Sequence, residues 1–124
     1  MKLDYTVSDD LHNQLKQKLR VFAAERDWDQ FHSPKNLSMA LIVEAAELVE
    51  HFQWLTEGQS HSLTAEKLAE VELELADIQL YLIRLADKLD IDLLAAADKK
   101  MLLNEKKYPA DKVRGSSKKY TEYD

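Results

Sequence analysis

The 124-residue sequence contains no cysteine and only two glycines and two prolines. Without cysteine, disulfide bonds and thiolate metal sites are excluded. The scarcity of glycine and proline disfavours β-turns and hairpins, whereas the helix-favouring residues Ala, Leu, Glu and Lys are plentiful. Hydrophobic residues make up 45% of the chain, enough to form a core. We therefore expect a single all-α domain.

Long apolar segments are also missing. No run approaches the roughly 20 residues that a membrane helix requires, and the N-terminus lacks the apolar region of a signal peptide. The formal net charge of −6 disfavours nonspecific binding to nucleic acids or anionic lipids. We expect a cytoplasmic protein that binds neither a nucleic acid polymer nor a membrane, and that needs local cations to bind a polyanionic substrate.

Hydrophobic periodicity predicts four helices, over residues 8–27, 34–55, 64–89 and 92–108. Ser8 is a suitable N-cap for the first, and Ser33 and Pro34 mark the start of the second. Gly58 and the polar residues after it predict a loop. Residues 1–109 are expected to form the helical domain, and residues 110–124 a polar tail that is extended or partly disordered.

Acidic residues interrupt the apolar pattern of the second helix. Its hydrophobic face is formed by Leu37, Leu41, Leu48 and Leu55. Glu44 falls in the middle of that face, and Glu47 and His51 fall on its edge. A carboxylate within an apolar stripe is informative, because burying an unpaired charge is strongly unfavourable.

The third helix has two apolar faces and an acidic strip between them. One face contains Leu68, Val71, Leu75, Ile78, Leu82, Leu85 and Leu89, and the other Leu73, Ala76, Leu80 and Ile83. The strip contains Glu70, Glu74, Asp77 and Tyr81. A helix that is apolar on two sides packs on two sides. Because so short a chain hardly supplies both neighbours, we expect self-association.

The acidic pairs Glu44/Glu47 and Glu74/Asp77 each have i, i+3 spacing, which places both members on one helix face. On antiparallel helices the pairs can face each other, and the four carboxylates must then take up protons or hold cations. Oxygen ligands alone favour Mg²⁺, with Mn²⁺ next, and bound Mg²⁺ commonly takes phosphate oxygens as further ligands. The alternative for either pair alone is a solvated helix face.

Two further groups of residues are candidates for binding a phosphorylated ligand. Lys100, Asn104 and Lys107 share a face of the fourth helix, where they could bind phosphate oxygens or simply complement the helix dipole. Spacing alone favours the dipole role. Ring-bearing side chains in loops or at helix ends could stack on a base or close the end of a core: Trp28, Phe31, His32 and Trp54.

Together these motifs resemble the MazG-like all-α nucleoside triphosphate pyrophosphohydrolases, and most closely their dCTP pyrophosphatase branch. The likeness extends from about residue 19 to residue 120. It is carried by residues 31–37 (FHSPKNL), 44–48 (EAAEL), 52–54 (FQW), 74–78 (ELADI), 81–82 (YL), Lys100, Met101, Asn104, 107–109 (KYP), 114–116 (RGS) and 119–120 (KY). One departure is Val43, where broad-specificity members often have another glutamate.

The resemblance implies a four-helix fold that assembles as a homotetramer, with some pocket residues supplied by a neighbouring subunit. It implies Mg²⁺-dependent hydrolysis of a nucleoside triphosphate, with dCTP as the best candidate, to the monophosphate and pyrophosphate, in the cleansing of nucleotide pools. The implied catalytic metal ligands are Glu44, Glu47, Glu74 and Asp77. The implied substrate-binding residues are Trp28, His32, Trp54, Tyr81, Lys100, Asn104, Lys107 and Tyr108.

Two other functions are weighed against this one. Di-iron carboxylate bundles use Glu-x-x-His pairs, but His51 lies four residues after Glu47 and no histidine follows Asp77 at that spacing. A second alternative is a non-catalytic helical oligomerisation module that binds a nucleotide or a metal. The Lys100/Asn104/Lys107 face favours catalysis over such a module.

Overall fold

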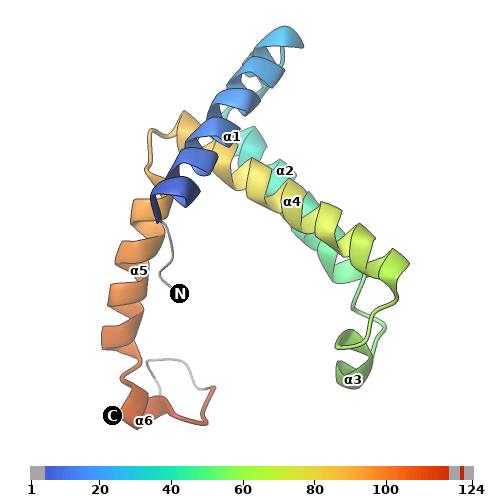
Figure 1. Cartoon of the computed structure of the whole chain (residues 1–124), viewed down its shortest axis with the longest axis vertical. Helices are drawn as coiled ribbons and strands as arrows, with labels where there is room; N and C mark the ends of the chain where they lie inside the picture. The colour runs from blue at the N-terminus through green and yellow to red at the C-terminus, as the bar shows by residue number, and fades with distance from the viewer. Residues whose placement is uncertain (1–4, 118–120, 122–124) are drawn as a thin grey trace. The chain divides into compact units, whose positions relative to one another are not determined.

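The computed structural model describes residues 5–117 and residue 121 and shows only helices and turns in this part of the chain (Figure 1). Its elements are α1 (Tyr5–Glu25), the 3₁₀-helix η1 (Asp29–Phe31), α2 (Pro34–Glu50), α3 (Glu57–Ser60), α4 (Ala65–Lys88), α5 (Leu93–Lys107) and α6 (Ala110–Val113). Contacts divide the chain into two compact units, Met1–Ile91 and Asp92–Asp124. The expected all-α class is confirmed.

Side-chain caps start three of the four expected helices where the sequence predicts. Ser33 accepts a hydrogen bond from the Asn36 amide at the start of α2, and Pro34 occupies the first helical turn. Thr64 caps α4 and Asp92 caps α5 in the same way, through the amides of Lys67 and Ala95. Each cap satisfies a backbone N–H that has no partner within its own helix.

The first and last segments differ from expectation. Helix α1 begins at Tyr5, so Ser8 lies inside the helix rather than at its N-cap. Residues 5–8 contain neither glycine nor proline, so the helix can extend by another turn at its N-terminal end. The tail also begins as a helix: Pro109 ends α5 and serves as the N-cap of α6, and its carbonyl accepts from the Lys112 amide at 2.9 Å. The expected extended conformation is therefore wrong for Ala110–Val113.

The second helix is shorter than predicted. Helix α2 ends at Glu50, turns follow, and the expected loop around Gly58 contains the short helix α3. Thr56 and Gln59 form a capping box, in which each side chain bonds to the other residue's backbone N–H. These bonds compete with continuation of α2 and start a new helix instead.

The first unit is organised around α4. Helix α2 lies antiparallel beside α4, and α1 crosses near the C-terminal end of α4 (Figure 1). The buried apolar residues are Ala23, Leu37, Val71, Ile83 and Ala86. At the crossing, the Arg20 guanidinium donates two hydrogen bonds to the Asp87 carboxylate, at 2.6 and 2.7 Å. This ion pair lies at the edge of the contact, where Arg20 is half exposed, so it adds little to the packing of α1 on α4.

Aspartates in the left-handed conformation turn the chain after α1 and after α4. Asp27 and Asp90 both have φ of 54°. The following amides reach back into the helices: Trp28 donates to the Ala23 carbonyl and Ile91 to the Ala86 carbonyl, both at 2.9 Å. This pairing is a Schellman-type helix ending, and aspartate tolerates the conformation better than most residues. After the first turn, η1 and His32 approach α4.

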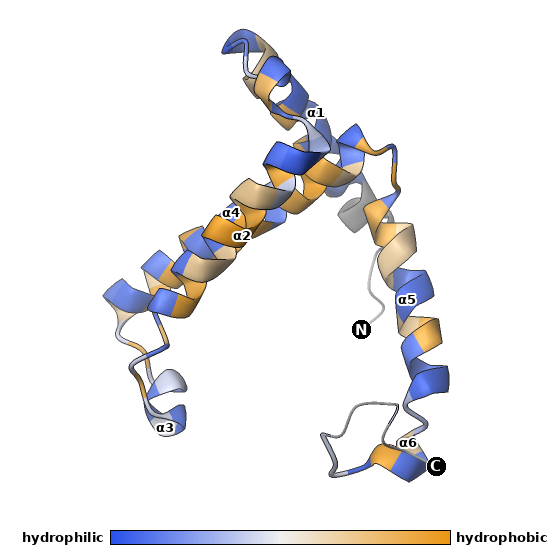
Figure 2. Ribbon diagram, turned by 180° about the vertical axis from the view of Figure 1, so that it is seen from behind, coloured by the Kyte–Doolittle hydropathy of each residue, from blue (hydrophilic) through white to orange (hydrophobic). Residues whose placement is uncertain are grey.

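Large apolar side chains remain uncovered on α2 and α4. The hydrophobic residues of both helices are coloured orange in Figure 2. On α2, Met39, Ile42 and Val49 lie at helical spacing, and Ile42 is 66% exposed. On α4, Ile83 and Leu73 belong to the same apolar face, but Ile83 is buried whereas Leu73 is exposed. Among the described residues, no helix combines the length and apolar character needed to cross a membrane.

Candidate functional site

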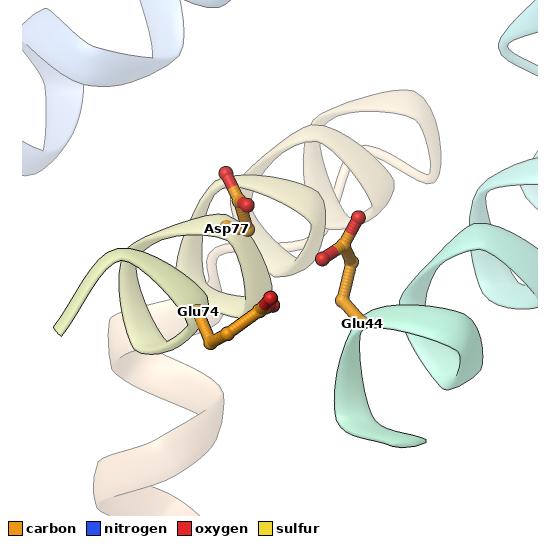
Figure 3. Close-up of side chains that lie close together, drawn as sticks. All are labelled: Glu44, Glu74 and Asp77. Carbon is orange, nitrogen blue, oxygen red and sulfur yellow. The ribbon is translucent and has the colours of Figure 1, made fainter. Parts of the chain in front are cut away.

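Three carboxylates converge between α2 and α4. Glu44 projects from α2 toward Glu74 and Asp77 of α4 (Figure 3). One oxygen from each side chain lies within 4.8 Å of the others. The i, i+3 spacing of Glu74 and Asp77 places both on the face of α4 that α2 approaches. Three of the four carboxylates predicted from the sequence therefore lie close together within a single chain.

The cluster contains polar atoms that are poorly satisfied by the protein. Glu44 Oε2 and Glu74 Oε2 are inaccessible to solvent and have no hydrogen-bond partner in the described part of the chain. An unpartnered buried carboxylate oxygen loses its hydration without compensation. Because a cation would compensate both atoms at once, the donor set fits a divalent metal with oxygen ligands.

The pKa values of the cluster reflect the same crowding. Burial, followed by the neighbouring Glu74, Glu47 and Asp77, raises the pKa of Glu44 to about 7. Burial also raises the pKa of Glu74, with Glu47 and Asp77 adding to the rise and Glu44 opposing it. At neutral pH the metal-free cluster therefore holds a proton for part of the time, and a bound cation would displace it.

This shift predicts how pH affects the metal-free protein. The folded-state pKa of Glu44, about 7, lies above its ordinary value of 4.5, so the folded protein binds a proton more tightly than the unfolded chain. The stability contributed by this proton is complete at low pH and is lost as the pH rises toward 7. In EDTA, the melting temperature of the wild type relative to a Glu44→Gln variant is expected to fall between pH 5 and pH 8.

The Glu44→Gln reference is needed because His32 acts in the opposite direction. Burial, with Arg84 and Lys88, lowers the pKa of His32, so its contribution to stability rises with pH. Subtracting the variant's melting temperature cancels this effect, since the variant retains His32. A wild-type-minus-variant difference that stays constant with pH would show that Glu44 is not desolvated in the folded protein.

Glu47, the fourth predicted ligand, lies beside the three-carboxylate cluster. It is half-buried and contributes to the raised pKa of both Glu44 and Glu74. Its oxygens are not among those that lie within 4.8 Å of one another. His51, the candidate for a di-iron pattern, instead lies 3.3 Å from the Lys67 ammonium and 3.8 Å from Glu70.

A cavity of about 400 Å³ borders the acidic cluster. Asp77 belongs to both the cluster and the cavity wall. The remaining wall is mostly apolar, with a few polar groups: Leu15, Lys18, Leu19, Phe22, Trp28, His32, Leu37, Leu80, Tyr81 and Arg84. Its size and mostly apolar lining suit a small organic ligand, and Asp77 is the residue at which the cavity meets the carboxylates.

Three of the predicted base-binding residues line this cavity, and one does not. Trp28 packs edge-on against Phe22 with ring centroids 5.7 Å apart, and its ring lies 6.5 Å from that of His32. Tyr81 is half-buried, and burial, followed by the nearby carboxylates, raises its pKa. Trp54 is 87% exposed and is not part of the cavity wall.

The sequence patterns did not identify Arg84, which contacts His32, or Asp29, which contacts Arg84. Arg84 donates to His32 and to Asp29. The available signal was an arginine flanked by Ile83 and Leu85 in the most apolar part of α4. Such a residue is buried only when partners satisfy its charge.

The predicted phosphate-binding residues lie in the second unit. Lys100 is exposed and Asn104 is half-buried on α5, and Lys107 and Tyr108 lie at its C-terminal end. Their role stays a prediction. Of the tail motif, Lys119 and Tyr120 lie outside the described residues.

The chain is similar in sequence and in fold to known proteins of one family. A model of the MazG-like family matches residues 39–123. The chain is 47% identical to human dCTP pyrophosphatase 1 over 103 residues, covering 82% of this chain and 61% of the human protein. The mouse protein of the same name is 45% identical over the same length and coverage. The chain thus spans about three fifths of these relatives.

A solved structure shares the fold. The crystal structure of a pyrophosphatase from Archaeoglobus fulgidus matches with a TM-score of 0.73 and 34% sequence identity. The match covers 88% of this chain and 98% of the archaeal chain. The two proteins therefore share amino-acid sequence as well as the arrangement of their helices.

Proposed function

Because the chain belongs to the MazG-like family, we propose that it hydrolyses a deoxynucleoside triphosphate, with dCTP as the first candidate, to the monophosphate and pyrophosphate. The observation that carries this proposal is that Asp77 belongs both to the acidic cluster and to the wall of the cavity. A cavity of nucleoside size and a cluster of unsatisfied carboxylates meet at this residue. Cleansing of nucleotide pools is the corresponding biological role.

Glu44, Glu74 and Asp77 would hold Mg²⁺, or Mn²⁺ in its place, with Glu47 as the fourth carboxylate. The two unpartnered oxygens and the all-oxygen donor set support this assignment. When bound, such an ion neutralises charge on phosphate oxygens and lowers the pKa of a coordinated water.

The protein's own side chains would bind and orient the substrate. Trp28 and Tyr81 would hold the base in the cavity, and the apolar wall would exclude bulk water from it. Glu47 is half-buried beside the cluster, which supports a role in orienting or deprotonating the attacking water. That water attacks the α-phosphorus, and the bond to the oxygen bridging the α- and β-phosphorus atoms breaks.

Cations of α5 would bind the leaving pyrophosphate. Lys100 and Lys107 carry the charge, and Asn104 and Tyr108 add hydrogen-bonding groups near the same helix end. Trp54, exposed in one chain, would complete the base pocket within an assembly. The uncovered apolar side chains of α2 and α4 support self-association, and the resemblance of the motifs favours a tetramer.

Product analysis tests the reaction. Incubation of the pure protein with dCTP and Mg²⁺ is expected to yield dCMP and pyrophosphate, and omission of the metal should stop the reaction. The other common and modified deoxynucleoside triphosphates, tested in parallel, establish base preference. Formation of dCDP and orthophosphate would contradict cleavage at the α-phosphorus. Tight binding of triphosphates without hydrolysis over hours would favour a non-catalytic nucleotide-binding module.

A further inference from the structure

Arg84 is a buried hydrogen-bonding centre in the wall of the cavity. Only 6% of its surface is exposed. Its Nε donates to His32 Nδ1 at 3.1 Å, and its Nη2 donates to Asp29 Oδ1 at 2.7 Å. Its Nη1 lies 3.8 Å from Asp87 Oδ2. The two carboxylates compensate the buried guanidinium, so the arrangement is electrostatically balanced.

The bond from Arg84 determines which nitrogen of His32 carries the proton. A guanidinium only donates hydrogen bonds, so Nδ1 must accept with its lone pair. The neutral ring then carries its proton on Nε2. Burial and the positive charges of Arg84 and Lys88 lower the pKa of His32, in keeping with a neutral ring.

The resulting donor belongs to a ring that lines the cavity together with Trp28 and Tyr81. We propose that Arg84 is a positioning residue that fixes His32 as the Nε2–H tautomer, so that His32 donates a hydrogen bond to an acceptor atom on the base of the bound nucleotide. The ligand in this proposal rests on the proposed function, whereas the tautomer rests on contacts within the chain. A base with a carbonyl oxygen or an unprotonated ring nitrogen facing His32 is accepted, and one with an N–H group there is disfavoured.

The contacts also suggest a matched pair of variants. Arg84→Met removes all three interactions of the guanidinium while keeping a long apolar stem. Lys88 still pairs with Asp29, and Arg20 still pairs with Asp87, so neither carboxylate is left alone. Arg20→Met is the control, because it removes an arginine from the same Asp87 carboxylate but has no hydrogen bond to His32.

The tautomer is measured directly by long-range ¹H–¹⁵N correlation spectra of the imidazoles. The chain has four histidines, and a His32→Phe variant identifies the His32 signals by their loss. The wild type and Arg20→Met are expected to show an unprotonated Nδ1 and a protonated Nε2 at His32. Arg84→Met is expected to show a mixture of tautomers. A protonated Nδ1 in the wild type would overturn the proposal, and this measurement requires no Arg84 variant to fold.

Kinetics test whether the donor is used. Loss of the hydrogen bond to the base in His32→Phe is expected to raise KM for dCTP about tenfold. Arg84→Met is expected to raise KM about twofold, because only some of the rings then carry the proton on Nε2, with kcat little changed and Arg20→Met like the wild type. In a His32→Phe background, Arg84→Met should add no further effect, because Arg84 acts through His32. Additive effects would overturn the positioning role. If no triphosphate is hydrolysed, the proposed function fails while the spectra still decide the tautomer.

Discussion

Glu44→Gln is expected to reduce the turnover of dCTP by at least about a thousandfold, because an amide cannot replace the carboxylate that we propose holds the catalytic cation. The substitution keeps the size of the side chain and removes one negative charge from the convergence of Glu44, Glu74 and Asp77. The remaining carboxylates would bind Mg²⁺ more weakly and with altered geometry. Steady-state rates over a range of Mg²⁺ concentrations measure both effects.

Stability measurements separate a catalytic role of Glu44 from a structural one. In EDTA at pH 8 the Glu44→Gln variant is expected to melt at a higher temperature than the wild type, because it lacks the charge that burial and its acidic neighbours oppose. Adding Mg²⁺ should raise the melting temperature of the wild type more than that of the variant. Helical content by circular dichroism should be equal in both.

Glu50→Gln provides the matched control for Glu44→Gln. Glu50 is the last residue of α2, is exposed, and undergoes the same change of charge and shape. We expect its turnover and its response to Mg²⁺ to equal those of the wild type. A Glu44→Gln protein that unfolds would make Glu44 structural, and one that keeps its turnover would remove Glu44 from the metal site.

The acidic cluster could be predicted from the sequence because its signal is local. Glu44 interrupts a leucine face, and the i, i+3 pairs must share a helix face whatever the tertiary structure. On antiparallel helices such pairs can face each other, and burial of the leucines favours an arrangement that covers Glu44 as well. Helix geometry and burial therefore made the meeting of Glu44 with Glu74 and Asp77 one of the arrangements to expect.

The Arg84 network could not be predicted in the same way. Its partners Asp29 and His32 are separated from Arg84 by 55 and 52 positions in the sequence. They reach it only because the left-handed Asp27 turns the chain after α1. No helical period encodes that turn. From the sequence alone, an isolated arginine next to Ile83 is as consistent with an exposed side chain as with a buried one. The cavity wall depends on the same crossing of α1 over α4.

Ile42→Lys is expected to dissociate the proposed assembly, because it places a charge in the uncovered apolar stripe of α2. Ile42 is 66% exposed and lies between Met39 and Val49 at helical spacing. Residues at positions 38, 39, 45 and 46 carry no charge, so the new ammonium gains no ion pair along the helix. If a second copy covers this stripe, burying the lysine is strongly unfavourable.

Sedimentation velocity at micromolar protein concentration measures the outcome. The wild type should sediment as an oligomer and Ile42→Lys as a smaller species, whereas Glu50→Gln, which changes the net charge by the same amount, should match the wild type. Turnover should fall with dissociation, since Trp54 is too exposed in a single chain to enclose a base. An Ile42→Lys protein of wild-type size would place the interface elsewhere, and a monomeric, fully active wild type would remove the need for a second chain at the site.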